Sequence, residues 1–193
     1  MIKKIIAGLI IGTSILSANN AQININNDTL GLEGEYGINE IYDLSSDAKY
    51  YFTLASLNSE SKDNKYRSTE RILNFGFKMM NPYINDNGLS LGLGVNAVWI
   101  NNYTKSFTAV PLSVFADYSI GEKVSINTNI SYAPKVLAFS SAKSYQEITT
   151  KVNYKVIDNG FAYIGYRNIK TKYNDNQTIK FDDNLFFGYK VQF

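Results

Sequence analysis

The sequence predicts an all-β protein, a transmembrane antiparallel up-and-down β-barrel of about eight to ten strands. Three observations carry this prediction: an N-terminal export leader, a period of two in the apolar residues after Asp28, and a chain end that continues this period to an aromatic residue. The composition agrees, because 15 Tyr and 11 Phe with only 3 Pro in 193 residues suit aromatic-rich strands joined by polar turns.

Residues 1–21 have the three-part layout of a secretory signal peptide. Two lysines precede an apolar run over residues 5–16, and small residues follow it. This run is shorter than the roughly 20 residues that a helix needs to cross a bilayer. We expect cleavage after Ala18 or Ala21, and we place the domain boundary at the second site, so that residues 22–193 form the barrel domain.

Nine segments after the leader alternate between apolar and polar residues, which is the period of a strand with two different faces. In residues 145–156, for example, Ile148 and Val152 share one face whereas Lys151 lies on the other. Single-chain barrels favour even strand counts, so either one candidate is false or segment 29–38 has a missing partner. The candidates are residues 29–38, 49–58, 71–79, 89–99, 111–119, 124–132, 145–156, 160–170 and 185–193.

The alternation fits a membrane barrel better than a soluble sheet. The apolar faces of the clearest strands carry no charge, and the strand lengths match the roughly 9–11 residues that a tilted strand needs to cross a bilayer. A soluble periplasmic, lipocalin-like barrel that binds a small ligand would show the same period, with the apolar face as a packed core. Aromatic residues near the strand ends favour the membrane, since they form interfacial girdles there: Tyr36, Trp99, Tyr118, Tyr132 and Tyr154.

The connections between the strands differ in length. Residues 119–123 and 156–160 read as tight turns, whereas 59–69, 134–142 and 171–180 read as longer polar or mixed loops. Short connections at one rim and long ones at the other are typical of outer-membrane barrels. The longer loops leave open a second function, a surface-exposed binding or adhesin-like barrel.

The last strand explains why the chain ends on an aromatic residue. A closing strand must be ordered to its end because closure removes the free sheet edge. The run also resembles the C-terminal signature of bacterial outer-membrane barrels, which implies recognition by the barrel-assembly machinery. The residues of this expected assembly signal are Phe187, Tyr189, Val191 and Phe193.

If the apolar faces meet lipid, the opposite faces point into a lumen that carries charges of both signs. Charges buried in a small barrel must be paired or hydrated, so we expect an ion-paired plug. The alternative is a narrow selective pore lined mainly by lysines. Arg167 counts as inward although it shares its parity with Tyr163 and Ile169. The expected lumen-facing charges are Glu33, Glu35, Lys78, Asp117, Glu147, Lys151, Lys155, Arg167 and Lys190.

The composition argues against enzymes, and we expect neither a metal site nor a cofactor. The sequence has no Cys and no His, which excludes disulfides, a lipoprotein anchor, Cys- or His-bound zinc and a Ser-His-Asp triad. Asp182 and Asp183 could do acid–base work, but we interpret them as a solvated loop edge at the mouth of the last strand. A net charge of +2 gives no reason to expect a nucleic-acid partner.

The C-terminal half resembles the YfaZ family of outer-membrane proteins. The similar residues are Tyr132 to Pro134 leaving a strand, Tyr145 to Glu147 starting the next, and Gly165 to Arg167 in the one after. The resemblance covers roughly residues 88–193; the N-terminal half departs from it, with fewer glycines and a longer charged loop. It supports the barrel fold and the outer-membrane location, and it implies no catalytic activity. From the alternation and the closing strand we expect an exported, monomeric barrel in outer-membrane lipid of a Gram-negative-type cell, with a structural or narrow-pore role.

Overall fold

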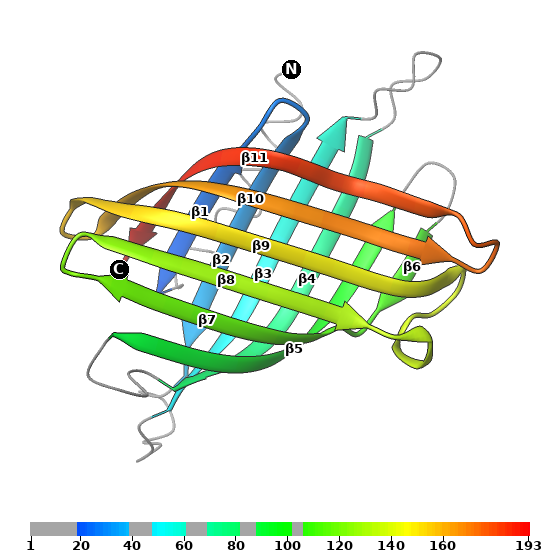
Figure 1. Cartoon of the computed structure of the whole chain (residues 1–193), viewed down its shortest axis with the longest axis horizontal. Coiled ribbons are helices and arrows are strands. Elements are labelled where there is room, and N and C mark those ends of the chain that lie inside the picture. The colour runs from blue at the N-terminus through cyan, green and yellow to red at the C-terminus, as the bar shows by residue number, and fades with distance from the viewer. Residues whose placement is uncertain (1–18, 39–47, 61–68, 82–87, 102–105) are drawn as a thin grey trace.

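The computed structural model describes residues 19–38, 48–60, 69–81, 88–101 and 106–193 (Figure 1). These residues form one closed antiparallel sheet, in which each strand pairs with its neighbours along the chain and β1 pairs with β11. No helix in these ranges is long and apolar enough to cross a membrane. The strands are β1 (Asn20–Ile25), β2 (Thr29–Gly37), β3 (Lys49–Glu60), β4 (Thr69–Asn81), β5 (Leu89–Asn101), β6 (Ser106–Ala109), β7 (Leu112–Ile120), β8 (Val124–Ala133), β9 (Ala142–Ile157), β10 (Gly160–Tyr173) and β11 (Thr178–Gln192).

The described sheet contains ten crossings, because β6 and β7 are two parts of one strand and both pair with β5. The interruption lies at Val110 and Pro111, because a proline has no N–H to donate to the sheet. The partner that segment 29–38 lacks in the sequence prediction is β1, which pairs with β2 and with the last strand. The predicted antiparallel barrel is therefore confirmed.

The N-terminal leader itself lies outside the described residues, because the description begins at Asn19. The first strand nevertheless starts at Asn20, before the boundary expected at residue 22. Ala21 pairs with Val191 on one side and with Gly34 on the other. Both candidate cleavage sites remain predictions, and they differ in whether the mature chain keeps the beginning of β1.

The outer surface of the barrel is apolar. Large side chains such as Leu93, Leu112 and Phe187 are each about 60% exposed, at 59%, 59% and 61%. Soluble proteins do not leave a continuous apolar surface of this extent in water. Together with closure, which satisfies the backbone hydrogen bonds of both edges, this surface defines a transmembrane barrel rather than a soluble carrier.

Aromatic side chains mark both borders of this apolar belt. We call the end where Asn19 lies beside Phe193 the termini end and the opposite one the loop end. Beyond the loop-end border the outward residues become polar, as at Gln146, Asn168 and Asp183. The exposed Tyr and Trp side chains of the described residues are Trp99, Tyr132 and Tyr166 at the loop-end border and Tyr36, Tyr118 and Tyr154 at the other.

The loop-end connections differ from the sequence prediction. The expected loop 171–180 is mostly strand, because β10 continues to Tyr173 and β11 begins at Thr178. Burial explains the difference: the Tyr173 side chain is only 2% exposed. The connection 134–142 is ordered by the short η1 turn (Lys135–Leu137), with Leu137 accepting a hydrogen bond from Val110 N at 2.8 Å. Most of the expected loop 59–69 lies outside the described residues.

At the termini end, the short turns 121–123 and 158–159 agree with the predicted rule. The connection between β2 and β3, residues 38–48, lies at this same end and is longer. The alternation of short and long connections therefore applies to the C-terminal half of the chain and does not extend to its first hairpins.

Candidate functional site

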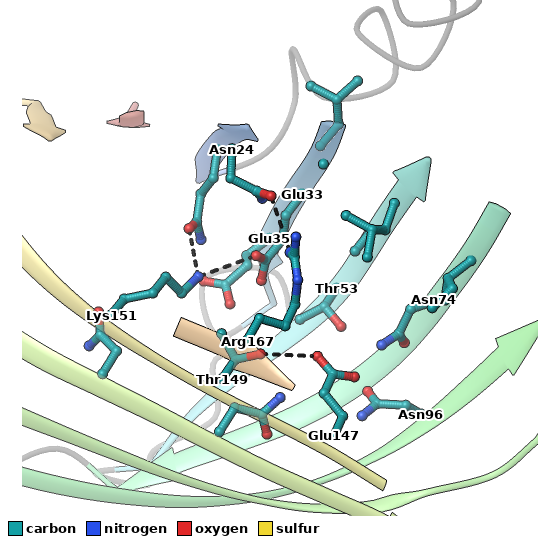
Figure 2. A pocket seen from close by; sticks show the side chains of 18 of the residues that line it. Asn24, Glu33, Glu35, Thr53, Asn74, Asn96, Glu147, Thr149, Lys151 and Arg167 are labelled. Carbon is teal, nitrogen blue, oxygen red and sulfur yellow. Dashed lines mark hydrogen bonds and ion pairs between the residues drawn. The ribbon is translucent and has the colours of Figure 1, made fainter. Parts of the chain in front are cut away.

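The barrel interior consists of two layers. Toward the loop end, apolar side chains fill it, and we call this set the apolar layer. Toward the termini end, polar and charged side chains predominate, and we call these side chains the polar layer. Most of them surround a cavity of about 190 Å³, which Leu57, Ile72 and Ile169 of the apolar layer also line (Figure 2). The apolar layer comprises Leu57, Ile72, Val98, Ile100, Phe107, Tyr145, Ile169 and Tyr173, each buried to 7% exposure or less.

The cavity collects most of the charges that the sequence places in the lumen. Lys155 lies outside the lining: its side chain is 34% exposed, and its Nζ pairs with Asp158 Oδ1 at 3.1 Å in the adjacent turn. The alternation assigned Lys155 correctly to the inward parity of β9, but the residue lies too close to the rim to reach the cavity. The predicted charges that line the cavity are Glu33, Glu35, Lys78, Asp117, Glu147, Lys151, Arg167 and Lys190.

Glu35 and Lys78 form an ion pair inside the polar layer, with 11% and 13% of their side chains exposed. The pair joins β2 to β4 past the intervening strand. Asn20 Nδ2 from β1 donates a second hydrogen bond to Glu35 Oε2 at 2.6 Å. Lys78 also lies over the Tyr51 ring, 5.0 Å from its centroid. Pairing and hydrogen bonding of this kind offset the cost of removing both charges from water.

Lys151 links β9 to the first two strands. Its Nζ donates to Gln22 Oε1 at 2.9 Å and lies 3.4 Å from Glu33 Oε2 (Figure 2). Because β10 and β11 lie between these strands in the sheet, the lysine reaches across the inner wall of the barrel. Lys190 lies over Phe161 instead, with Nζ 4.8 Å from the ring centroid.

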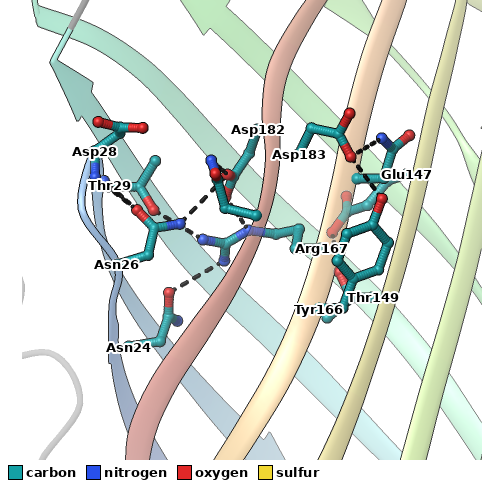
Figure 3. Close-up of polar contacts among 12 residues, drawn as sticks. Asn24, Asn26, Asp28, Thr29, Glu147, Thr149, Tyr166, Arg167, Asp182 and Asp183 are labelled. Atoms are coloured by element: carbon teal, nitrogen blue, oxygen red, sulfur yellow. Dashed lines mark hydrogen bonds and ion pairs between the residues drawn. The ribbon is translucent and has the colours of Figure 1, made fainter.

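Arg167 is the most completely bonded of these charges, and 8% of its side chain is exposed. Nε donates to Asp182 Oδ2 at 2.7 Å, Nη1 to Asn24 Oδ1 at 3.1 Å and Nη2 to Thr29 Oγ1 at 3.1 Å (Figure 3). The guanidinium also lies 4.8 Å from the centroid of the Phe186 ring. These bonds tie β10 to β11, β1 and β2, on both sides of the junction between the first and last strands.

Asp182 corrects the interpretation of the two aspartates as a solvated loop edge. Asp182 is 3% exposed and faces the lumen, whereas Asp183 faces outward beyond the apolar belt (Figure 3). The separation follows from alternation, because successive side chains of a strand point to opposite faces. Extending the alternation of residues 185–193 back to residue 182 would have found this inward carboxylate.

Neutral polar residues complete the polar layer, and charge-based reasoning from the sequence missed them. Asn96 Nδ2 donates to Ser113 Oγ at 2.7 Å, and the Ser113 and Ser131 hydroxyls lie 2.7 Å apart. Glu147 accepts a hydrogen bond from Tyr145 Oη at 2.8 Å, at the boundary with the apolar layer. The described residues include no cluster of acidic, His or Cys side chains that could hold a metal ion. This interior therefore stabilises the barrel through bonds between strands.

The C-terminal residues close the sheet. Val191 pairs with Ala21 and Tyr189 with Ile23, and Phe193 N donates to Asn19 O at 3.0 Å. The Phe187 and Phe193 side chains face outward, 61% and 68% exposed. The last residue is thus held by the first strand, as closure requires. The role of Phe187, Tyr189, Val191 and Phe193 as an assembly signal remains a prediction.

The closed sheet, the apolar belt and the filled lumen define a transmembrane β-barrel with a polar interior. Comparison with known families makes the assignment more specific. Residues 5–193 match the model of the YfaZ precursor family, so the chain belongs to the YfaZ family. The resemblance noted in the C-terminal half is thereby confirmed and extends over nearly the whole chain.

Two further comparisons complete the picture. The structure is similar to the crystal structure of the outer membrane channel DcaP of Acinetobacter baumannii, with 11% sequence identity and a TM-score of 0.45. The similarity covers 91% of this chain and 72% of the DcaP chain. A search of curated proteins finds no match.

Proposed function

We propose that this protein is a structural barrel of the outer membrane in a Gram-negative-type envelope, with a lumen closed to solutes. Three features support this location: the family membership, the predicted export leader and an apolar belt between aromatic girdles. In this proposal the termini end faces the periplasm and the loop end faces outward, which is the usual orientation of such barrels. The barrel acts as a monomer in lipid and has no catalytic role.

The observation that carries the proposal is the apolar layer. Phe107 packs edge-on against Tyr173 with ring centroids 5.7 Å apart and lies 6.4 Å from the Tyr145 centroid. An ion that entered this layer would lose its hydration and meet mainly hydrocarbon, since only Tyr145 and Tyr173 among its members carry a polar group, which makes entry energetically costly. The charged cavity below it is bridged by ion pairs between strands. A continuous aqueous path for charged solutes is therefore not expected.

Planar-bilayer conductance tests the closed lumen. The wild-type barrel should give no current steps, whereas a Phe107→Ala, Tyr173→Ala double variant should conduct because it removes the rings that fill the apolar layer. Gel mobility with and without boiling checks that both proteins are folded barrels. Current steps in the wild-type protein, with an ion preference that changes in Lys151→Glu, would instead support the narrow-pore alternative.

The location is tested separately by fractionation. The protein should appear in the outer-membrane fraction and migrate differently before and after boiling, as a detergent-resistant barrel does. Recovery from the soluble periplasm without a mobility shift would contradict the proposal.

A further inference from the structure

The outward face of β10 and β11 carries three lysines beyond the loop-end border of the apolar belt. Lys170 on β10 lies directly opposite Lys180 on β11, and Lys172 is the next outward residue of β10. Like charges directly opposite each other destabilise a sheet, so this arrangement needs a compensating negative charge. This negative charge can come from carboxylates of the protein or from a bound anion.

One carboxylate, Asp183, lies beside the patch. It accepts hydrogen bonds from Lys180 Nζ at 2.6 Å and Asn168 Nδ2 at 2.8 Å. Tyr166 Oη donates a third at 2.5 Å (Figure 3). The Lys180 ammonium and these two donors favour the charged form of the Asp183 carboxyl, because hydrogen bonds to an ionised group stabilise it. Asp183 therefore stays ionised and neutralises Lys180.

The other two lysines remain uncompensated. Lys170 and Lys172 make no side-chain hydrogen bond or ion pair with any residue that the structure describes. Their cross-strand neighbours on β9 are the neutral donors Gln146 and Ser144. The patch therefore presents two free ammonium groups among neutral donors, which is a suitable surface for an oxyanion.

The position of the patch indicates the source of that anion. The apolar belt ends at Tyr166 on β10 and Leu185 on β11, which are paired. Lys170 follows Tyr166 by four residues, or about 13 Å along a tilted strand. The ammonium groups thus lie in the headgroup region of the leaflet whose acyl chains contact Tyr166 and Ile148. A free phosphate would gain nothing from this alignment, whereas a phosphorylated lipid would contact both zones at once.

We propose that Lys170 and Lys172 bind the phosphate groups of an anionic glycolipid of the outer leaflet, a phosphorylated glucosamine lipid of the lipid A class. This rests on the proposed outer-membrane location, with the loop end outward. Lys180, held by Asp183, positions the edge of the patch and is not a primary ligand. Gln146 and Ser144 donate hydrogen bonds to the sugar and phosphate oxygens. The lipid compensates the charges of Lys170 and Lys172 and orders the long β9–β11 hairpins.

Lipid binding to the full-length folded barrel in neutral detergent tests the proposal, with diphosphoryl lipid A as the probe. Affinity is read from the rise in the heating midpoint of the gel-mobility shift across a lipid titration. The Lys170→Gln, Lys172→Gln double variant should bind about 30-fold more weakly, because each lysine near an anionic surface contributes roughly fivefold. Binding should also weaken with added salt, as exposed charges are screened. The matched control is Lys49→Gln, Lys123→Gln, which removes two exposed lysines at the termini end.

Each outcome of this experiment decides the proposal. It is supported if diphosphoryl lipid A binds, if a dephosphorylated lipid of the same acyl composition does not, and if only the Lys170 and Lys172 variant loses binding. It is overturned if that variant binds as the wild type does, if the dephosphorylated lipid binds equally, or if inorganic phosphate alone reproduces the shift. The result is independent of conductance: a conducting barrel that binds the lipid refutes the closed lumen only, and a closed barrel that does not bind it refutes the patch only.

Discussion

Arg167 and Ile169 are neighbours on the inner face of β10, yet they belong to different layers of the barrel interior. Arg167 is held by four groups on β1, β2 and β11, three of them through hydrogen bonds. Ile169 is 2% exposed and belongs to the apolar cluster that includes Phe107 and Tyr173. Removing one leaves a charge without its partner, whereas removing the other leaves a cavity. The comparison predicts different responses to substitution within a single strand.

The largest effect is expected at Arg167. Arg167→Met leaves the Asp182 carboxylate buried without its cation, so the free energy of unfolding should fall by about 3–5 kcal/mol. Urea unfolding in lipid vesicles measures it, with the lipid-facing Trp99, which is the only tryptophan of the sequence, as the fluorescent probe. The double variant Arg167→Met, Asp182→Leu should recover most of the loss because no charge is left unpaired. A single variant within about 1 kcal/mol of the wild type would show that its other donors, Asn26 and Asn184, or water suffice to solvate Asp182 without Arg167.

A smaller effect is expected at Ile169. Ile169→Ala should lower the free energy of unfolding by about 2–4 kcal/mol, since it loses both the burial of the side chain and the packing around it. Ile164 on the same strand is the matched control, because it is 43% exposed and faces lipid. Ile164→Ala should cost about 1–2 kcal/mol, as lipid fills the space and only the transfer of the side chain is lost. Equal losses at both positions would mean that the apolar layer is loosely packed.

These layers explain how much of the molecule could be predicted from its sequence. The lipid face is predictable because lipid requires an apolar residue at nearly every second position, as at Leu89 to Trp99 in β5. The inner face has no such uniform requirement: Arg167 and Ile169 are both inward, and only their depth in the barrel decides which type fits. Periodicity does not report depth. The apolar layer was therefore not predicted. Alternation implied inward parity only for those of its residues that lie in the expected strands, and Phe107 and Tyr173 lie outside them.

Two local errors have equally physical reasons. The strand β1 is only 6 residues long and directly follows the leader, so its alternation at Ile23 and Ile25 is too short to recognise. The second error is the expected loop 171–180. Just before it, a register shift between Ile169 and Lys170 changes which residues of β11 face inward. Such a bulge interrupts simple alternation, and polar sequence around Tyr173 then resembles a loop although the strands continue.

The smallest effect on the free energy of unfolding is expected at Asn20, in the polar layer. The same residue also bears on where the leader is cleaved. Asn20 is 8% exposed, and its side chain donates to the Glu35 carboxylate that pairs with Lys78. Cleavage after Ala21 would remove this donor, together with the Asn19 carbonyl that accepts from Phe193 N. We therefore expect cleavage after Ala18, so that the intact mass of the purified barrel corresponds to a chain starting at Asn19.

Substitution of Asn20 gives the matching energetic measurement. In a chain that keeps this residue, Asn20→Ala should lower the free energy of unfolding by about 1–2 kcal/mol, because a buried hydrogen bond to a charged group is lost. Asn27→Ala, an exposed turn residue at the loop end, should change it by less than about 0.5 kcal/mol. A mature chain that starts at Gln22 would be identical in the wild type and in Asn20→Ala. The two proteins would then unfold alike, and Glu35 would depend on Lys78 alone among the partners described here.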